Sequence, residues 1–378
     1  MIRVLMVTDS LSMAGAFWRS AGPFSELNKS FDHIQFKWVD PQIVASGQVP
    51  WSEFRWTDWV FMHRPATPVQ YEFYKRAKDL GCKIWIDIDD HLFKIPLDNS
   101  TCAFYNNPDT QRIMHDMVVN AEVVSTSTPF LKDSFDFLRK KTDTILLPNG
   151  IPVEWWETMR NKLVKREMKD KVPTIMWRGS QHHQKDLVYY HHAIIDIAKK
   201  YEKVHWSFVG FNPWFITEQI GKNWDNRPAT EVTQYFKNLL LVQPDVTIVP
   251  IWDCEFNYSK SNIGWIESIF AGAVSLSPGW AHWDHPGSQC YKAGDINSFH
   301  TLLDKACSEM MTGALDHKWK IIDESWEFIK DKYDVAFFNS QIRKPILEGN
   351  LGVAQDTSNM IYKELYPKHV NIIQNQTV

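Results

Sequence analysis

The sequence predicts an α/β protein with two doubly wound domains, each a parallel sheet covered by helices. Short apolar runs rich in β-branched residues alternate with longer segments of helical pattern, and this alternation occurs twice along the chain. The chain has 378 residues, of which 44% are hydrophobic and 23% charged. This length suffices for two domains with their own cores, and the composition excludes a disordered, collagen-like or coiled-coil protein.

In the first half of the chain, strands are expected where β-rich apolar runs occur: Ile2–Val7, Trp59–His63, Lys83–Ile88, Val123–Thr126 and Thr144–Leu147. Between them lie segments of helical length: Pro23–Asn28, Val69–Leu80, Asp109–Ala121 and Pro129–Lys140. Because strands separated by helical crossovers pair in parallel, a first parallel sheet is predicted.

The second half repeats this pattern. Its expected strands are Thr174–Trp177, His205–Val209, Val246–Val249 and Val274–Ser277. Its expected helices are Asp186–Glu202, Glu231–Val242, Ile263–Ala271 and Ile296–Met311. A second parallel sheet follows from the same argument.

The domain boundary is expected between Pro148 and Pro173. Pro148-Asn149-Gly150 is typical of a turn, and the charged stretch Arg160–Lys171 after it is a candidate linking helix. We therefore predict an N-terminal domain over residues 1–160, a C-terminal domain over residues 172–335, and a helical tail over residues 336–378.

Charge and cysteine usage narrow the class of protein further. Lys and Arg number 41 against 45 Asp and Glu, so no overall positive field would attract nucleic acid or anionic lipid. A nucleic-acid surface would require a local basic patch. The five cysteines form no CxxC pair, which is typical of reduced thiols. Neither a signal sequence nor a membrane span is recognisable, and we expect a cytoplasmic protein without a transmembrane segment.

Ligands of parallel α/β sheets bind beyond the carboxyl ends of the strands, so the residues that follow each strand are candidates. After the first expected strand, the segment 10–23 contains Gly15 and Arg19. A glycine there would let backbone N–H groups approach a phosphate or a sugar, and a purely structural turn is an equal alternative. The segment lacks GxGxxG, so a plain dinucleotide-binding fold is not supported.

A run of acidic residues follows the strand Lys83–Ile88. Alternation places Asp87 and Asp89 on one face of the strand end, while Asp90 and His91 fall in the next loop. Clustered carboxylates need a cation, hydrogen-bond donors or water. Three interpretations follow: a wall of acceptor-binding and acid/base groups in a cleft, a helix cap, or a divalent-metal site for a nucleoside diphosphate. We favour the first.

In the second half, Arg178, Gly179 and Ser180 follow a strand, and Lys185 lies in the first turn of the next helix. A cation, a glycine and a serine at a helix N-terminus favour an anion site. The nearby histidines at 182, 183, 191 and 192 lack the spacing of a helical zinc site, which favours a solvated helix face.

The passage from Pro250 to Gly279 contains the densest set of candidates. A polar loop leads into a helix that bears Glu267, and the loop contains Asp253, Glu255, Asn257, Ser259, Lys260 and Ser261. Loop N–H groups and Lys260 could bind a diphosphate, and Glu267 could accept hydrogen bonds from both hydroxyls of a ribose. A surface glutamate is the alternative, but the apolar neighbours of Glu267 predict a buried carboxylate that needs partners.

The segment FNYSKSNIGWIESIFAGAVSLS resembles the nucleotide-sugar motif of glycosyltransferases with the GT-B fold, of the family-four or family-one type. In that motif a lysine–serine loop leads into a helix that bears a glutamate. The resemblance covers most of the chain, because WRSAGP, IWIDIDDHLF, VVSTSTPFL…ILLPNGI and WRGSQHHQKDL fall where that family has corresponding pieces. It implies two facing Rossmann-like domains, with the donor nucleotide held mainly by the C-terminal one. The final helix is expected to pack back on the N-terminal domain.

The resemblance also implies an activity: transfer of a hexosyl or pentosyl group from a nucleoside-diphosphate sugar, with a UDP-sugar favoured, to a hydroxyl acceptor. The acceptor would be a saccharide, a protein or a hydroxylated DNA base. No metal is expected, because such folds usually need none. By the match, Glu267 binds the donor ribose, Arg178, Lys185 and Lys260 contact the diphosphate, and the remaining donor-binding candidates are Gly15, Gly179, Asn257, Ser259 and Ser261. Asp89, Asp90 and His91 lie where related enzymes present groups to the reacting sugar.

One position departs from the family pattern. Retaining members carry two glutamates with seven residues between them, and the position that precedes Glu267 in this way is Ser259. Glu255 or Asp253 would then have to reach the sugar. We expect a retaining glycosyltransferase, with a nucleotide-sugar epimerase of the same fold and a catalytically silent nucleotide- or sugar-binding protein as alternatives.

Overall fold

The structure is a computed structural model that describes residues 1–8, 14–40, 43, 46, 48, 51–140, 142–280, 282–367 and 369. The chain divides into two compact units. The first contains residues 1–152, 259–261 and the part from 333 onward, and the second contains residues 153–258 and 262–332. Two parts of the predictions lie outside the described residues: the start of the glycine-containing loop, 10–13, and the end of the tail, 370–378.

The first unit is built on a six-stranded parallel sheet in the order β2-β1-β3-β4-β5-β6. The strands are β1 (Ile2–Val7), β2 (Ile34–Val39), β3 (Trp59–His63), β4 (Lys83–Ile88), β5 (Val123–Thr126) and β6 (Ile145–Leu146). Since neighbouring strands are parallel, their carboxyl ends lie at one edge of the sheet. β3 and β5 are buried along their whole length, and each begins with apolar residues in the sequence.

Helices connect these strands: α1 (Ala14–Arg19), α2 (Ala21–Ser30), α4 (Trp51–Trp56), α5 (Pro68–Asp79), η1 (Leu92–Lys94), α6 (Cys102–Tyr105), α7 (Pro108–Asn120) and α8 (Pro129–Arg139). The three longest begin at side-chain caps followed by proline. Thr67 and Gln70 form a capping box on α5, Asn107 caps α7, and Thr128 caps α8. These caps satisfy backbone N–H groups that have no partner within the helix.

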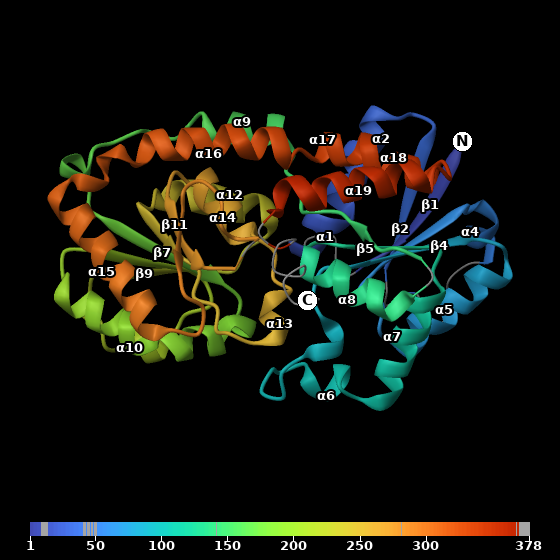
Figure 1. The fold of residues 1–378 in the computed structure, drawn as a ribbon, viewed down its shortest axis with the longest axis horizontal. Coiled ribbons are helices and arrows are strands. Elements are labelled where there is room, and N and C mark those ends of the chain that lie inside the picture. The colour runs from blue at the N-terminus through green and yellow to red at the C-terminus, as the bar shows by residue number, and fades with distance from the viewer. Residues whose placement is uncertain are drawn as a thin grey trace. The chain divides into compact units, whose positions relative to one another are not determined.

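The C-terminal segment belongs to the same unit. It forms α17 (Val335–Phe338), the π-helical turn η5 (Asn339–Arg343), α18 (Lys344–Leu347) and α19 (Leu351–Leu365), which lie close together in Figure 1. The Ser358 hydroxyl accepts a hydrogen bond from the backbone N–H of Leu146 at 2.7 Å, and the Asn339 amide donates to the carbonyl of Pro23 at 2.9 Å. The segment therefore completes the core of the first unit.

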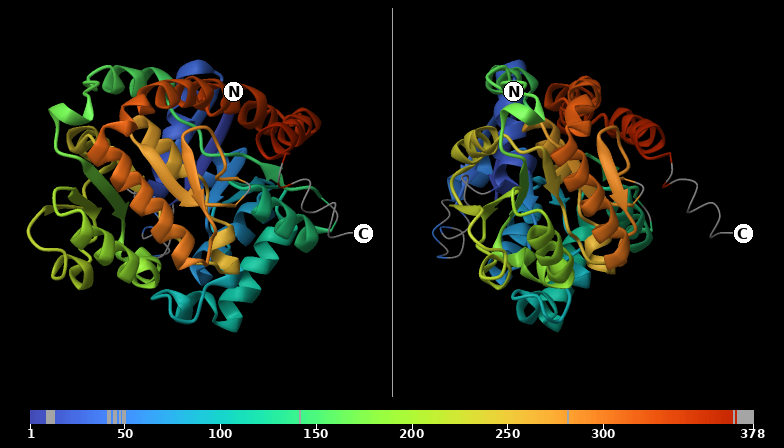
Figure 2. Two further views of the ribbon diagram at one scale, coloured as in Figure 1. Left: turned by 60° about the vertical axis from the view of Figure 1, so that its left-hand side comes forward. Right: turned by 90° about the vertical axis from the view of Figure 1, so that its left-hand side faces the viewer.

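The second unit has another six-stranded parallel sheet, in the order β12-β11-β10-β7-β8-β9. The strands are β7 (Thr174–Gly179), β8 (His205–Gly210), β9 (Trp224–Pro228), β10 (Val246–Ile248), β11 (Val274–Pro278) and β12 (Ser288–Tyr291). Its longer helices are α9 (Val153–Arg160), α10 (Gln184–Lys200), α12 (Val232–Val242), α14 (Ile263–Phe270), α15 (Ile296–Thr312) and α16 (Lys318–Lys332). Figure 2 shows α15, in orange, running beside the strands β11 and β12.

Shorter turns of the second unit are η2 (Met168–Asp170), η3 (Gln181–His183), α11 (Trp214–Thr217), α13 (Glu255–Tyr258) and η4 (Ala314–His317). The linking helix expected over Arg160–Lys171 is wrong: α9 ends at Arg160, and the stretch contains only the turn η2. Its side chains pair with acidic neighbours instead, Lys165 with Asp323 and Lys171 with Asp245.

Tryptophan contributes mainly to the two cores. Five tryptophans are among the largest fully buried side chains: Trp85, Trp156, Trp206, Trp265 and Trp283. Trp156, for example, packs against Phe236 and Phe270 with ring centroids 4.7 and 4.4 Å away.

Two parallel six-stranded sheets confirm the predicted fold class. No helix in the described part of the chain is both long and apolar enough to cross a bilayer.

Candidate functional site

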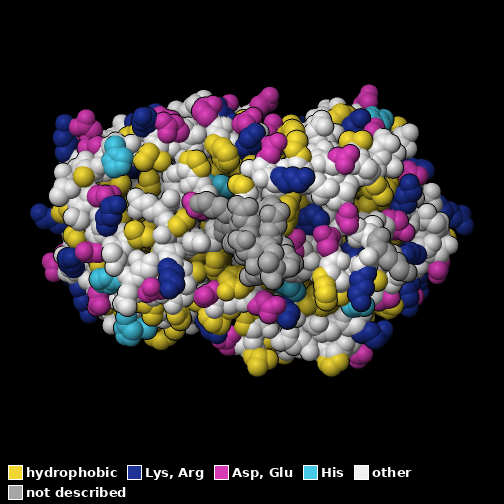
Figure 3. Space-filling view, viewed as in Figure 1, with side chains coloured by type: hydrophobic (Ala, Val, Ile, Leu, Met, Phe, Trp, Pro, Cys, Tyr) yellow, Lys and Arg dark blue, Asp and Glu magenta, His cyan; other side chains and the backbone are white. Residues whose placement is uncertain are grey.

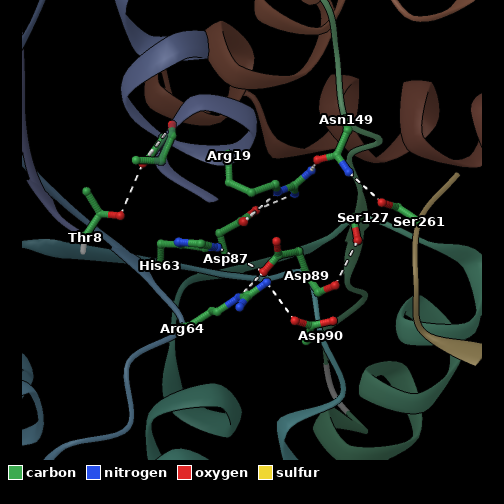
Figure 4. A network of polar contacts seen from close by, with 12 residues as sticks. Thr8, Arg19, His63, Arg64, Asp87, Asp89, Asp90, Ser127, Asn149 and Ser261 are labelled. Atoms are coloured by element: carbon green, nitrogen blue, oxygen red, sulfur yellow. Dashed lines mark hydrogen bonds and ion pairs between the residues drawn. The ribbon is translucent and has the colours of Figure 1, made fainter. Parts of the chain in front are cut away.

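A buried ion pair holds the carboxyl edge of the first sheet together (Figure 4). Arg19, at the end of α1, donates two hydrogen bonds to Asp87 on β4, from Nε at 2.8 Å and from Nη2 at 2.7 Å. Its Nη1 donates to the carbonyl of Leu147 and to Oδ1 of Asn149, and the hydroxyl of Ser125 also donates to Asp87. Both charged side chains are almost fully buried. A buried pair remains charged only with such complete hydrogen bonding.

The next two carboxylates share one guanidinium. Arg64 contacts Asp89 through Nε and Asp90 through Nη2, the latter at 2.8 Å. His63, the last residue of β3, lies 3.0 Å from Asp89 through Nε2. Burial raises the pKa of Asp89, but the charge of Arg64 and the contact with His63 outweigh burial and hold this pKa well below its usual range. Asp89 is therefore a carboxylate at neutral pH.

Arg64 has an unusual backbone conformation that fixes its position in this cluster. Its φ is 49°, in the left-handed region that side-chain-bearing residues rarely adopt, and its N–H donates to the carbonyl of Asp87 at 3.0 Å. Such a conformation costs of order 1 kcal/mol and occurs where the surroundings hold it in place, often at functional sites.

Residues 259–261, which belong to the first unit, each contact this edge. The hydroxyl of Ser259 accepts a hydrogen bond from the backbone N–H of His91 at 3.2 Å. Lys260 donates to Oδ1 of Asp90 at 2.7 Å, and the amide of Asn149 donates to the hydroxyl of Ser261 at 2.9 Å. Lys260, predicted as a diphosphate ligand, is thus paired with a predicted catalytic carboxylate.

The imidazole of His91 lies in an aromatic cluster. Its ring centroid is 6.0 Å from that of Phe130, 6.1 Å from that of Phe135 and 6.5 Å from that of Phe93, and the residue is 7% exposed. Gly15 packs against the ring of His63, because a Cβ added at Gly15 would lie 3.0 Å from Cε1 of that ring. The first sheet therefore gathers seven predicted residues: Gly15, Asp89, Asp90, His91, Ser259, Lys260 and Ser261.

Two alternatives for the acidic run can be compared with this geometry. The short helix η1 begins after His91 without a side-chain cap, so the aspartates do not cap it. Asp87, Asp89 and Asp90 each pair with a cation: Arg19, Arg64 or Lys260. Within the described ranges, no group of three His, Cys, Asp or Glu side chains has the geometry to hold a metal ion.

In the second unit, the other predicted carboxylate lies at the carboxyl edge of the sheet. Glu267, on α14, is 3% exposed and forms an ion pair with Nε of Arg178 at 2.7 Å. The hydroxyl of Tyr235, on α12, donates to the same oxygen, Oε2, at 2.7 Å. Burial raises the pKa of Glu267 above its usual value, and the charge of Arg178 and the Tyr235 hydrogen bond offset only part of this rise. The predicted buried carboxylate with partners is present.

A second buried carboxylate, Asp186, anchors the loop that follows β10. Its Oδ1 accepts hydrogen bonds from the backbone N–H of Trp252 at 3.2 Å and from the amide of Asn257 at 3.0 Å. Its Oδ2 lies 3.0 Å from Nδ1 of His183. The ammonium of Lys185 lies over the Trp252 ring, 4.0 Å from its centroid. Lys185 and Asn257 are thus brought together around one loop.

At the tips of β7 and β8, two glycines lie in contact. A Cβ at Gly210, whose φ is +104°, would lie 2.2 Å from the carbonyl oxygen of Gly179. A Cβ at Gly179 would lie 2.7 Å from the ring of Trp177. Close packing therefore requires glycine at both strand ends, because the Trp177 ring lies against Gly179 and the Gly179 backbone lies against Gly210.

Sequence reasoning missed His63, Arg64, Tyr235 and Asp186 as site residues. His63 ends a buried strand and Arg64 follows it directly, so the rule that identified Asp87–His91 could have found them. Tyr235 lies mid-helix, 32 positions from Glu267, and no local signal connects the two.

No protein-family model and no curated protein sequence matches the chain. The structure is similar to sucrose-phosphate synthase from Thermosynechococcus elongatus, with a TM-score of 0.64 at 9% identity, over 94% of this chain and 100% of that one. It is similar to HepE from Anabaena in complex with UDP and glucose, with a TM-score of 0.59 at 12% identity, over 92% of this chain and 99% of the other. It also matches an alpha-glucosyltransferase in complex with UDP and a 13-mer DNA containing an HMU base, with a TM-score of 0.58 at 12% identity, again over 92% and 99%. The chain has the GT-B fold that its sequence predicts.

Proposed function

We propose that the protein is a glycosyltransferase that moves a sugar from a nucleoside-diphosphate donor, preferably a UDP-sugar, to a hydroxyl acceptor. The observation that carries this proposal is the buried carboxylate of Glu267, held by Arg178 and Tyr235 at the carboxyl edge of a parallel sheet in a GT-B fold. Removing a carboxylate from water is energetically costly. A buried carboxylate at the edge of the sheet where ligands bind therefore supports a functional role for its charge.

We assign the donor nucleotide to the second unit. Both contacts of Glu267 use Oε2, which leaves Oε1 to accept hydrogen bonds from the ribose hydroxyls. Arg178 uses Nε for that ion pair, so its Nη groups can reach the diphosphate. Gly179 is proposed to bind the donor through its backbone, and Asn257 anchors its own loop through its hydrogen bond to Asp186. Lys185 completes the anion-binding set.

We assign the reacting sugar and the acceptor hydroxyl to the edge of the first sheet. Asp89, Asp90 and His91 are the proposed groups at the reaction centre, and Gly15, Ser259 and Ser261 are proposed to position the donor. Lys260 is proposed to neutralise charge on the departing diphosphate, which accelerates glycosyl transfer by stabilising the leaving group. Its present pairing with Asp90 then has to be exchanged for the phosphate.

We propose a retaining transfer that needs no divalent metal, in a cytoplasmic protein. The residue paired with Glu267 by family spacing is Ser259, so Glu255 or Asp253 is proposed as the acidic group near the sugar. The anomeric configuration of the product, determined by NMR, tests the stereochemistry. Activity retained in excess EDTA tests the metal independence.

An epimerase is the rival enzyme class. One similar structure, from Listeria monocytogenes, carries the name UDP-N-acetylglucosamine 2-epimerase and has a TM-score of 0.52. An epimerase would convert the donor without any acceptor, and a silent binding protein would bind nucleotide without turnover. Both are distinguished from a transferase by following donor, free nucleotide and sugar product in one reaction.

The test uses purified protein with UDP-glucose, UDP-galactose and UDP-N-acetylglucosamine, each with and without a mixture of saccharide acceptors, and measures UDP release. We expect release with one donor, faster with acceptor, and at least tenfold slower in Glu267→Gln, because a charge-assisted hydrogen bond is lost. Glu324→Gln is the matched control, since Glu324 lies on α16 and its side chain is 62% exposed. UDP release at wild-type rate from Glu267→Gln would refute the proposed donor site, and epimerised donor without UDP release would replace transferase by epimerase.

A further inference from the structure

One ring nitrogen of His63 is buried and takes part in none of the contacts described above. The residue is 3% exposed, and Nε2 of its imidazole contacts Asp89 at 3.0 Å. Its other ring nitrogen, Nδ1, is buried and has no hydrogen-bond partner among the described residues. Buried polar atoms almost always have a partner, in the protein, in water or in a ligand.

The contact with Asp89 determines what Nδ1 can bind. A carboxylate only accepts hydrogen bonds, so in the neutral imidazole the proton resides on Nε2 and Nδ1 carries a lone pair. Asp89 is itself held by Arg64, which keeps the carboxylate charged and in place. In the neutral imidazole, Nδ1 is therefore an acceptor that requires an N–H or O–H donor.

Gly15 packs against the edge of this ring and adds no side chain there. A Cβ at Gly15 would lie 3.0 Å from Cε1 and 3.8 Å from Nδ1 of His63. Gly15 is not among the glycines with positive φ, so its backbone does not require glycine. The requirement is steric, and it concerns the ring edge that bears the unpartnered nitrogen.

We propose that Nδ1 of His63 accepts a hydrogen bond from a hydroxyl group of a sugar bound at the edge of the first sheet, with Asp89 as the positioning residue. The inference rests on the proposed function for the identity of the ligand as a sugar. A neutral hydroxyl fits this position better than an anion, because Nδ1 offers a lone pair and Asp89 lies directly behind the ring.

The test observes the ring nitrogens directly, in the full chain labelled with ¹⁵N-histidine. His63→Gln identifies the His63 signals in a long-range ¹H–¹⁵N spectrum. We expect the Nε2-protonated tautomer in the free protein and a shift of the Nδ1 signal on adding sugar. One arm adds UDP-glucose, UDP-galactose or UDP-N-acetylglucosamine; the other adds free glucose, galactose or N-acetylglucosamine together with UDP. The two arms distinguish a donor sugar from an acceptor sugar.

Two variants sharpen the result. Gly15→Ala places a methyl group against the ring edge and is expected to abolish the Nδ1 shift while leaving the tautomer unchanged. His63→Gln is expected to lower the affinity for the sugar that causes the shift roughly tenfold, because about one hydrogen bond is lost. Tyr71→Phe, which removes a hydroxyl contact to Asp116 between α5 and α7, is the control and should behave like wild type.

A protonated Nδ1 in the free protein would overturn the proposal, as would an Nδ1 signal that no sugar in either arm moves; the latter result would mean that a water occupies the position. UDP binding, measured by calorimetry on the same samples, separates this outcome from failure of the proposed function. If UDP binds and Nδ1 does not respond, only the His63 assignment is wrong. If UDP does not bind, the proposed function itself fails.

Discussion

The first unit contains two arginine–aspartate pairs of the same geometry in opposite environments. Arg19 binds Asp87 through Nε and Nη2 at 2.8 and 2.7 Å, and Arg3 binds Asp58 through the same atoms at 3.1 and 3.0 Å. The side chains of the first pair are 0% and 1% exposed, whereas those of the second are 37% and 40% exposed. Substituting the aspartate in each pair therefore compares the loss of a buried counter-charge with the loss of an exposed one.

We expect Asp87→Asn to destabilise the first unit by about 3–5 kcal/mol, because it leaves the Arg19 guanidinium buried without a counter-charge. Asp58→Asn should cost about 0–1 kcal/mol, because water solvates the released Arg3. For a unit of this size, the difference corresponds to a melting temperature lower by roughly 10 °C for Asp87→Asn.

Differential scanning calorimetry with circular dichroism measures both variants against wild type under one condition. The double variant Arg19→Met with Asp87→Leu should recover much of the loss, since it removes both buried charges. Equal melting shifts for Asp87→Asn and Asp58→Asn would refute the claim that the buried pair organises this edge.

Burial lowers the pKa of Lys318, which contacts Asp245 at 2.6 Å, to about 8. Between pH 8 and 10.5 the unfolded chain then binds more protons than the folded chain, so the free energy of unfolding should rise with pH by up to about 3 kcal/mol relative to that of Lys318→Met. Urea midpoints that change with pH in the same way in the two proteins would contradict this. Tyr235→Phe should destabilise the second unit by about 1–2 kcal/mol in chemical denaturation, because Oε2 of the buried Glu267 loses a donor; an unchanged midpoint would mean that the hydroxyl contributes nothing. Basic side chains of the stretch after Arg160 pair with acidic side chains, and both charge signs are mixed over the face seen in Figure 3. Duplex DNA should therefore bind with a dissociation constant no lower than the non-specific range of about 10⁻⁴–10⁻⁶ M. A nanomolar, salt-sensitive complex in a mobility-shift assay would favour DNA as acceptor.

The predicted strands are short segments rich in apolar and β-branched residues, and the structure has a strand at each of them. The three strands that sequence reasoning missed lie at sheet edges: β2 is an edge strand of the first sheet, and β9 and β12 are the two edge strands of the second. Edge strands bury less, so β2 alternates apolar and polar residues and β9, Trp224–Pro228, contains no apolar run at all. Their pairing depends on the neighbouring strand more than on their own composition.

The site residues divide in the same way. Asp87, Asp89 and Glu267 are visible in the sequence because a charged residue at the end of a buried strand or within an apolar helix needs an explanation. Their partners are not visible, because Arg64 becomes a partner only through its left-handed backbone and Tyr235 only through the packing of α12 near α14. Sequence patterns locate buried charges, whereas the choice of counter-charge depends on the tertiary structure.

The most direct test of the central claim is a calorimetric titration of UDP into wild-type protein, Glu267→Gln and the control Glu324→Gln. We expect wild type and control to bind UDP with equal affinity and Glu267→Gln to bind at least tenfold more weakly, because the carboxylate is proposed to hold the ribose. Equal affinity in all three proteins would mean that UDP does not bind at Glu267. If UDP did not bind to wild type, the proposed nucleotide site at the carboxyl edge of the second sheet would be contradicted.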